Sequence, residues 1–421
     1  MVSKTIKSEP ITRRRVLKAG AVMPLAALVP VGVHRGRSTI RVGVIGCGGR
    51  GTGAARDCSK TEGVEIVAMG DLFADRMARS RKNLSERIGA SYKVDDAHAF
   101  VGFDACDRVL ACDVDLVILA TPPAFRPQQL EKAINAGKHV FMEKPVAVCP
   151  AGIRQVIEVA AKAKEKRLSL VAGTQRRHQA PYLETIKRIH DGAIGDVVAA
   201  RCYWNQGFLW HYARKRDDSD VEWQVRNWLY FTWLSGDHIV EQHIHNIDVI
   251  NWVMGGPPKR ARGMGGRQVR TNPKFGQIFD HFAIEYEYPN GAHCTSMCRQ
   301  IDGTWREVGE QVIGTEGTSA PGGWIRGESK WAWKGKRISA YVQEHADLIA
   351  SIRAGEPLNE GKRVAESTLT AIMGRMSAYT GKTVTWDFAR NKSQLDLRPQ
   401  SLDFGQRPAG EVSVPGVTPL V

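Results

Sequence analysis

The sequence predicts an α/β protein with two domains, a doubly wound parallel sheet followed by an α+β domain. Three observations support this class. A strand-like run at residues 40–45 ends in a glycine-rich turn, strands and helices then alternate to about residue 170, and the pattern beyond is that of an antiparallel sheet. At 421 residues the chain is long for one core, and its 43% hydrophobic and 24% charged residues are ordinary for a soluble enzyme.

The N-terminus has the pattern of an export signal. Arg13 and Arg14 are followed by Leu17 and then by an apolar stretch of fifteen residues, 19–33, which is shorter than the ~20 residues that span a bilayer. This arrangement resembles a twin-arginine (Tat) signal, which implies recognition by the twin-arginine translocase and delivery to the periplasm. We therefore expect residues 1–38 to be a signal and linker; the alternative is a basic tail with no targeting function.

The net charge of +15 is concentrated at the N-terminus, where residues 1–40 hold eight Lys and Arg against Glu9 alone. The rest of the chain has no sustained basic run, so we expect no nucleic-acid partner, whereas an anionic substrate stays open. The eight cysteines form neither a Cys-x-x-Cys motif nor a disulfide framework, and we expect mainly free thiols.

The first domain, residues 39–170, has the pattern of a Rossmann dinucleotide-binding fold. The apolar run at 40–45 is followed by Gly46-x-Gly48-x-x-Gly51, and a second strand ends in Asp71, twenty residues after Gly51. Glycines at these positions allow a tight turn and close approach of a pyrophosphate to a helix N-terminus. Asp71 would accept hydrogen bonds from the ribose hydroxyls, which favours NAD, although nearby Arg76 leaves NADP open.

The alternation continues with a strand at 114–123, a helix at 127–138, a strand at 139–145, a helix at 151–167 and a strand at 168–178. Thr121 and Pro122 form the turn after one strand, and Glu143 and Lys144 stand at the carboxyl end of the next. Ligands of open parallel sheets bind beyond these ends. Lys144 is therefore placed where chemistry would occur.

The second domain, residues 171–390, has strand patterns at 194–204, 279–299 and 305–319 and helical patterns at 342–357 and 363–382; residues 391–421 are a tail with several prolines and glycines. Residues 236–248 combine three histidines, two aspartates and a glutamate with isoleucine and valine. In one helix, Asp237, His238, Glu241, His245 and Asp248 would share a stripe. A buried helix with a polar stripe indicates a site; the alternative is a helix end with solvated charges.

The glycine motif, "ATPP" at 120–123 and "EKP" at 143–145 together resemble the Gfo/Idh/MocA family of nicotinamide-dependent oxidoreductases, with glucose–fructose oxidoreductase and inositol dehydrogenase among its members. The resemblance implies an open-faced sheet that carries the substrate and an oligomer interface, hence a homo-oligomer. It also implies cofactor contacts from Gly46, Gly48, Gly49, Arg50, Gly51, Asp71, Thr121, Pro122, Glu143 and Lys144.

The family's signature helix, Asp-x-x-x-His-x-x-Asp, corresponds here to Glu241, His245 and Asp248, with glutamate in place of the first aspartate and His243 where glycine is common. By this resemblance His245 would take the proton from a substrate hydroxyl as hydride leaves its carbon. Lys144 would stabilise the developing negative charge, and Glu241 would orient His245 or contact another hydroxyl.

The extra histidines raise a metal alternative, in which His238, Glu241, His243 and His245 hold a divalent ion. On a regular helix, however, His238 and His243 would project about 140° apart. A metal site is therefore less favoured than the catalytic helix that the resemblance implies.

The segment 204–233 holds five of the eleven tryptophans. Aromatic rings stack on sugar C–H faces, so Trp204 is a candidate substrate contact, with Arg176, His243 and Asp248 as further candidates. The alternatives are a hydrophobic plug or a subunit contact for the tryptophans and structural ion pairs for the arginine.

An exported enzyme has no free nicotinamide pool, so its cofactor should stay tightly bound. Two reactions satisfy this condition. In one, a sugar or polyol is oxidised and a second substrate reoxidises the cofactor; in the other, a transient keto-sugar permits cleavage of a glycoside and the hydride then returns, so that the enzyme is a redox-neutral hydrolase or lyase. A nucleotide-sensing binding protein is a third, non-enzymatic reading.

Overall fold

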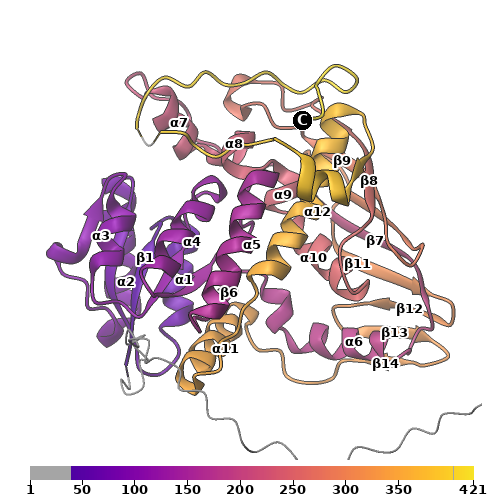
Figure 1. Ribbon diagram of the computed structural model, residues 1–421, viewed down its shortest axis with the longest axis horizontal. Coiled ribbons are helices and arrows are strands. Elements are labelled where there is room, and N and C mark those ends of the chain that lie inside the picture. Colours follow the sequence, from indigo (N-terminus) through magenta and orange to yellow (C-terminus); the bar gives the residue numbers. More distant parts are fainter. Residues whose placement is uncertain (1–38, 402) are drawn as a thin grey trace, which may run out of the picture. The chain divides into compact units, whose positions relative to one another are not determined.

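The first sheet, which contains β1 and β6 of Figure 1, consists of six parallel strands in the spatial order β3-β2-β1-β4-β5-β6. The strands are β1 (Ile40–Ile45), β2 (Val64–Asp71), β3 (Ala99–Val101), β4 (Leu116–Leu119), β5 (His139–Met142) and β6 (Leu170–Ala172). The order reverses between β1 and β4, which opens a crevice beyond their carboxyl ends. The computed structural model describes residues 39–401 and 403–421, and the signal expected at residues 1–38 lies outside the described part.

Helices bury both faces of this sheet, and for that reason its central strands are apolar without alternation. Val42 and Val44 of β1 and Leu116 and Ile118 of β4 are fully buried. The helices of this part are α1 (Gly49–Cys58), α2 (Ala74–Arg87), α3 (Ala105–Ala111), α4 (Arg126–Asn135) and α5 (Pro150–Glu165).

Two helices from the C-terminal part of the chain return to the first sheet. Helix α11 (Ala340–Ala354) contacts β5 and β6, and α12 (Gly361–Thr380) packs along α5. Leu348 and Ile349 of α11 join the same apolar core as Phe141 of β5. The first sheet is therefore completed by residues distant in sequence.

The second sheet has nine strands in the order β14-β13-β12-β11-β7-β10-β9-β8-β15. They are β7 (Val197–Gln206), β8 (Arg260–Gly266), β9 (His281–Glu287), β10 (His293–Gln300), β11 (Glu307–Gly314), β12 (Gly317–Ala320), β13 (Trp324–Gly327), β14 (Trp331–Ala332) and β15 (Val384–Thr385). Every neighbouring pair is antiparallel except β7 and β10. The predicted class, a Rossmann sheet followed by an open-faced, mainly antiparallel sheet, is confirmed.

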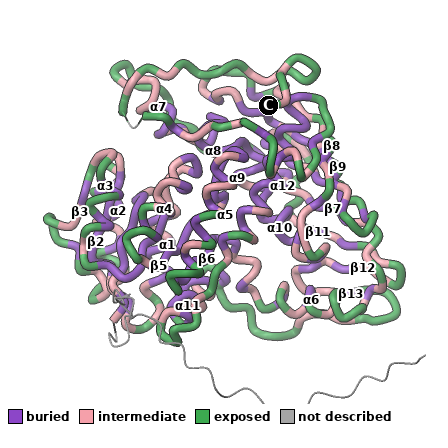
Figure 2. The backbone as a smooth tube through the Cα atoms, in the orientation of Figure 1, coloured by how far each residue is buried: buried purple, intermediate pink, exposed green. Residues whose placement is uncertain are grey.

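The second sheet is covered on one face by helices α9 (His238–Glu241), α10 (Ile244–Val253) and α12. Phe282, Ile284 and Tyr286 of β9 are buried against this layer, whereas Glu285 between them and Thr295 of β10 are exposed. The helices of the layer are largely drawn as buried in Figure 2. This period of two is the expected pattern of a sheet with one open face.

The polar segment at 236–248 forms two short helices where the sequence predicted one. The helices of this region are α6 (Ala180–His190), α7 (Asp220–Arg226), α8 (Thr232–Ser235), α9 (His238–Glu241) and α10 (Ile244–Val253). Asp237 has φ = +77° and caps α9 through its own carboxylate, which also accepts hydrogen bonds from Phe279 N at 2.8 Å and from the Tyr379 hydroxyl. These contacts fix the start of α9. The interruption itself lies at Gln242 and His243, where His243 N donates to the His238 carbonyl oxygen at 3.3 Å.

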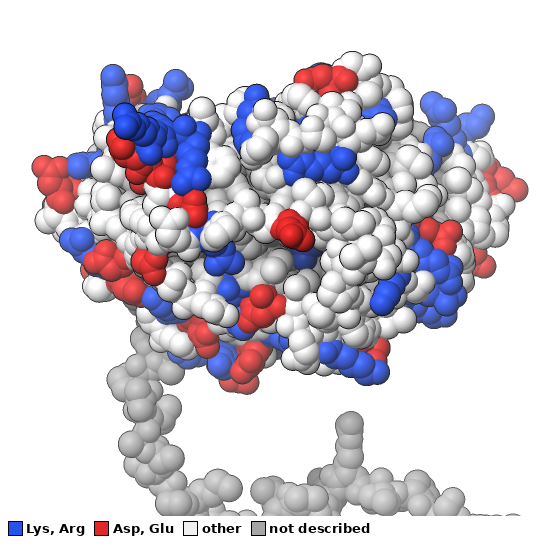
Figure 3. All heavy atoms as spheres, turned by 90° about the horizontal axis from the view of Figure 1, so that it is seen from above, with Lys and Arg blue, Asp and Glu red and all other residues white. Residues whose placement is uncertain are grey.

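Shorter single turns complete the described part: Gly89–Ser91, Asp96–His98, Pro123–Phe125, Gln175–His178, Trp228–Tyr230, Pro273–Phe275 and Phe388–Lys392. Among the described residues, none of the helices is both long and apolar enough to cross a membrane. All eight cysteines are free thiols, seven of them buried. On the face of the molecule in Figure 3, basic and acidic side chains are interspersed.

We predict that Gly51→Ala destabilises the protein by about 3 kcal/mol or more, because a Cβ there would lie 1.8 Å from the carbonyl oxygen of Gly46. Gly53→Ala, two residues further along α1, is the matched control, since its Cβ would meet only Arg50 Nη1 at 3.6 Å. The control should be neutral or gain about 0.5–1 kcal/mol. Urea unfolding of both variants measures the difference, and equal stabilities would contradict the packing.

Candidate active site

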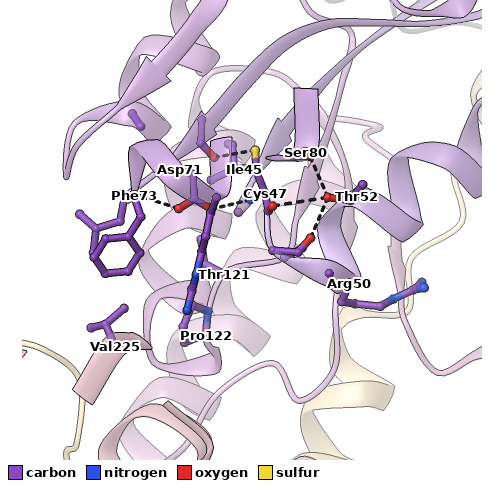
Figure 4. A pocket seen from close by; sticks show the side chains of 18 of the residues that line it. Ile45, Cys47, Arg50, Thr52, Asp71, Phe73, Ser80, Thr121, Pro122 and Val225 are labelled. Carbon is purple, nitrogen blue, oxygen red and sulfur yellow. Dashed lines mark hydrogen bonds between the residues drawn. The ribbon is translucent and has the colours of Figure 1, made fainter. Parts of the chain in front are cut away.

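A cavity of about 640 Å³ lies at the carboxyl edge of the first sheet, along the turns that follow β1, β2 and β4 (Figure 4). Its wall includes Gly46, Gly48, Gly49, Asp71, Thr121 and Pro122, which are among the cofactor contacts expected from the sequence. Neither Lys144 nor His245 lines this cavity. The cavity therefore corresponds to the part of a dinucleotide site that lies away from those two side chains.

The glycines of the motif differ in what they contribute. Gly46 has φ = +94° and lies so close to Ala120 and Thr121 that a Cβ would fall 2.6 Å from their backbone. A Cβ on Gly48 or Gly49 would meet no protein atom within 4 Å, so these two residues face open space at the start of α1. A helix N-terminus bordered by open space suits a pyrophosphate.

Asp71 is fixed at the end of β2 by two backbone N–H groups. Its carboxylate accepts hydrogen bonds from Cys47 N at 2.6 Å and Phe73 N at 2.8 Å (Figure 4). Burial raises the pKa of Asp71, against the lowering effect of these two bonds. The free lone pairs of its oxygens can accept ribose hydroxyls, so the residues present fit a dinucleotide.

Arg50 is placed differently from the expected direct contact. Its guanidinium turns away from the labelled lining residues in Figure 4 and pairs with Glu143, and with Glu344 at 3.3 Å. Burial and the neighbouring Glu143 raise the pKa of Glu344 well above its usual value. Arg50 thus joins α1 to Glu143, the residue after β5, and to α11, and it also lines the cavity at the glycine turn.

Lys144 lies immediately beyond β5 and contacts the second domain. Its Nζ donates to Glu241 Oε1 at 2.9 Å and to the Glu241 carbonyl oxygen at 2.5 Å. Buried Arg126 supports this corner by donating to the Pro145 carbonyl oxygen. The Lys144 side chain is 12% exposed, so most of it is held in place.

His245 lies in the first turn of α10, with Trp204 of β7 stacked beside it at 5.6 Å between ring centroids. Burial, followed by the positive charges of Lys144, Arg176 and Arg50, lowers the pKa of His245 well below its usual value. The imidazole is therefore neutral at pH 7 and can accept a proton. Its Nδ1 and Glu241 Oε2 are both buried without a hydrogen-bond partner among the described residues.

Two of the four predicted substrate contacts, Asp248 and His243, are held by partners within the protein. Asp248 is buried one turn further along α10 than His245, where its carboxylate pairs with Arg177 at 2.8 Å and accepts from Ser367 at 2.7 Å. His243 is buried against the second sheet, and its Nε2 pairs with the Ser296 hydroxyl at 2.7 Å. Trp204 and Arg176 remain near His245, although Arg176 also pairs with Glu310.

The metal alternative is not supported by the geometry. His238 accepts a hydrogen bond from Gln300 at 2.6 Å, His243 bonds Ser296, and Glu241 bonds Lys144, so the break between α9 and α10 sends these side chains to different partners. Within residues 39–401 and 403–421, no cluster of three His, Cys, Asp or Glu side chains could hold a metal ion.

Several residues of the site had not been singled out from the sequence. Arg126 and Glu344 stand in ordinary helical patterns, and no local signal marks them. Trp210, Tyr212 and Trp228, which line the dinucleotide cavity from the second domain, lie in the tryptophan-rich segment. From the sequence, the many tryptophans of this segment predict a contact with the substrate. Apart from the number of aromatic rings, nothing in the sequence indicates that the segment also lines the dinucleotide cavity.

Two family models match the chain. The model described as "Oxidoreductase family, NAD-binding Rossmann fold" matches residues 40–171, and the "GFO/IDH/MocA C-terminal domain" matches residues 182–320. Among solved structures, GenD2 from gentamicin A biosynthesis in complex with NAD superposes with a TM-score of 0.64 at 22% identity, over 85% of this chain and 99% of that one.

Three curated relatives match the chain at 23–27% identity. Inositol 2-dehydrogenase 3 of Saccharopolyspora erythraea is 26% identical over 336 residues, which are 76% of this chain and 88% of that enzyme. An oxidoreductase of Streptococcus pneumoniae is 27% identical over 60% of each chain. The 2,7-anhydro-N-acetylneuraminate hydratase of Escherichia coli is 23% identical over 61% of this chain and 60% of the hydratase. This chain therefore spans less than two thirds of the latter two relatives.

The protein is a two-domain NAD-binding oxidoreductase. Its parallel sheet is of the dinucleotide-binding type, and the open-faced sheet carries α9, whose Glu241 contacts Lys144 beyond β5. The chain belongs to the GFO/IDH/MocA family, on the evidence of both family models. Its N-terminal domain is a Rossmann domain that binds NAD.

We predict that acid destabilises the protein through buried histidine. Burial lowers the pKa of His238 from 6.5 to about 3. Between these two pH values the His238 imidazole is protonated in the unfolded chain and neutral in the folded chain. This contribution to stability is complete above pH 6.5 and is lost as the pH falls toward 3, by about 2 kcal/mol at pH 5.

Urea unfolding at pH 7 and pH 5 of the wild type and of His238→Gln tests this prediction. The variant should lose less stability between the two pH values, whatever its stability at pH 7. An identical pH dependence in both proteins would contradict the assignment.

Proposed function

We propose that the protein is a nicotinamide-dependent oxidoreductase that transfers hydride between a hydroxyl-bearing carbon of a sugar or polyol and a tightly bound NAD. The arrangement of Lys144, Glu241 and His245 carries this proposal. A cation bonded at 2.9 Å to a carboxylate lies beside a neutral, buried imidazole at the carboxyl edge of a dinucleotide-binding sheet. NADP is the alternative cofactor, since Arg76 lines the cavity together with Asp71.

The chain's own residues account for the proton and the charge. His245 accepts the proton of the substrate hydroxyl while the C–H electron pair leaves as hydride and a carbonyl forms. Lys144 donates a hydrogen bond to the same oxygen and stabilises its developing negative charge. When bound, NAD supplies the hydride acceptor.

Glu241 and Trp204 would bind the substrate. The buried, unpartnered Oε2 of Glu241 can accept a second substrate hydroxyl, which would remove the cost of leaving that oxygen unsatisfied. Trp204 presents a partly buried ring next to His245, and aromatic rings bind the C–H faces of sugars. The Saccharopolyspora relative, an inositol dehydrogenase, supports a polyol or sugar as the substrate class.

Export and assembly belong to the same proposal. The arginine pair at Arg13 and Arg14 supports export to the periplasm through the twin-arginine translocase, with the cofactor retained. The open face of the second sheet supports a homo-oligomer, since more than one large apolar residue is exposed on it, Met264 of β8 at 77% and Ile313 of β11 at 36%.

A second function is favoured by one observation, the relation to the E. coli hydratase. In a redox-neutral hydrolase or lyase, oxidation of one sugar hydroxyl to a ketone acidifies the neighbouring C–H, a leaving group departs, and the hydride returns to the ketone. The same three residues, Lys144, Glu241 and His245, would serve this chemistry. The products and the net redox state of the bound cofactor distinguish the two functions.

We predict that Lys144→Ala and His245→Ala each lower kcat by about 10²–10⁴-fold while the bound cofactor is kept. The reason is that both side chains lie beyond the cavity lined by the glycine motif and Asp71. Steady-state kinetics together with cofactor content measures both effects. Loss of cofactor from either variant would contradict the roles assigned to them.

The direct test of the function is ultraviolet absorption of the purified protein, mixed with a panel of inositols, aldoses and glycosides, together with product analysis. A nicotinamide that becomes reduced and stays so until a second carbonyl compound arrives supports the oxidoreductase. Steady cleavage of a glycoside without net reduction supports the redox-neutral enzyme. Absence of both reduction and cleavage across the panel would contradict the proposed function.

A further inference from the structure

The dinucleotide cavity is lined by aromatic residues from the second domain. Trp210, Tyr212 and Trp228 share its wall with the Rossmann residues, together with Val225, which lies beside Phe73, Thr121 and Pro122 in Figure 4. Trp210 stands edge-on to both of the others, with ring centroids 5.4 Å from Tyr212 and 6.2 Å from Trp228. Trp210 and Tyr212 are each 44% exposed, which is unusual for large rings in a cavity wall.

The segment that carries these rings, residues 208–228, is firmly attached to its own domain. The buried Tyr230 hydroxyl donates to the carbonyl oxygens of Leu209 at 3.1 Å and Trp210 at 2.5 Å. The buried Asn227 side chain accepts from Tyr212 N at 2.9 Å. The rings are thus presented on a fixed backbone.

The same segment is closed onto the Rossmann domain by arginine contacts. Arg226 of α7 pairs with Asp75 of α2 at 3.0 Å, and its guanidinium lies 3.8 Å from the centroid of Phe73. Arg76 donates to the Arg226 carbonyl oxygen at 3.2 Å and lies between the rings of Phe73 and Tyr212, at 5.0 and 5.9 Å. On the Rossmann side, all these contacts are made by residues 73–76, which follow Asp71 in the chain.

The C-terminal tail, which passes over α7 in Figure 1, adds a second attachment. Phe404 contacts Phe73 at 6.0 Å and Phe103 at 4.8 Å between centroids, and both of those rings line the cavity. The tail is tied to α7 by hydrogen bonds from Val221 N to the Gly405 carbonyl and from Arg407 N to Asp220. Phe404 does not itself line the cavity.

We propose that residues 208–228, held down by Phe404, clamp the adenosine half of the bound dinucleotide and set the rate at which the cofactor leaves. The adenosine half is indicated because Asp71, the ribose acceptor, is the residue beside which the clamp closes. An adenine ring there would bury the exposed faces of Trp210 and Tyr212. This inference rests on the nicotinamide cofactor of the proposed function, and it explains how that cofactor stays bound through turnover.

The test measures cofactor retention rather than turnover. Holoprotein of the wild type, Trp210→Ala and Tyr212→Ala is mixed with excess competing nucleotide, and the release of NADH is followed by its fluorescence. Each variant should release NADH about tenfold faster, because stacking of one base on an aromatic ring has about that effect. Affinity for AMP should fall by a similar factor, whereas affinity for nicotinamide mononucleotide should not change.

Three further variants make the result specific. Trp210→Phe keeps a ring and should restore retention. Phe404→Ala removes a ring that touches only the wall, and should speed release if the tail positions the clamp. Trp305→Ala is the control, since Trp305 is 52% exposed but does not line the cavity, and it should release NADH like the wild type.

Unchanged release from Trp210→Ala, Tyr212→Ala and Phe404→Ala, in proteins with wild-type thermal unfolding, would overturn the clamp. Equal losses of AMP and nicotinamide mononucleotide affinity would overturn its assignment to adenosine. If NADH is held by the clamp but no sugar or polyol reduces bound NAD, the proposed function fails while this inference stands.

Discussion

The contact between Lys144 and Glu241 joins the two halves of the candidate site. One end of it depends on the parallel sheet, because Lys144 follows β5 directly and Arg126 holds the next peptide. The other end depends on the backbone of the second domain, since Glu241 offers both its carboxylate and its carbonyl oxygen to the same ammonium group. A charged pair so little exposed must keep its geometry to offset the cost of its desolvation. The surrounding packing supplies this restraint.

The break between α9 and α10 decides which polar groups reach that contact. Asp237, with its positive φ, fixes the start of α9, and the chain then turns so that His238 and His243 face β10, while Glu241 and His245 are left beside Lys144. Three buried histidines of one short segment thereby receive different environments. Only His245 has a buried ring nitrogen without a partner and also lies near the lysine. His243, which departs from the family pattern, stabilises the packing of the helix on the sheet.

The sequence was sufficient for the parallel sheet, its glycine turn and the position of Lys144, because each follows from local pattern and from the geometry of strand ends. The positions of Asp248 and His243 could not be predicted in this way. Asp248 pairs with Arg177, 71 residues away, and His243 with Ser296, 53 residues away, so both depend on tertiary packing. The interruption between α9 and α10 could not be predicted for the same reason, since the residues on either side of it, Glu241 and His243, bond Lys144 and Ser296 from distant elements.

The central claim is that a substrate C–H bond delivers its hydrogen to the bound nicotinamide beside Lys144 and His245. Its most direct test uses inositols and aldoses deuterated at their hydroxyl-bearing carbons in a single turnover, followed by the mass of the cofactor released on denaturation. At least one substrate should transfer one deuterium to the cofactor in the wild type, and the transfer should be about 10²–10⁴-fold slower in Lys144→Ala. A product formed while the cofactor stays unlabelled would contradict the central claim.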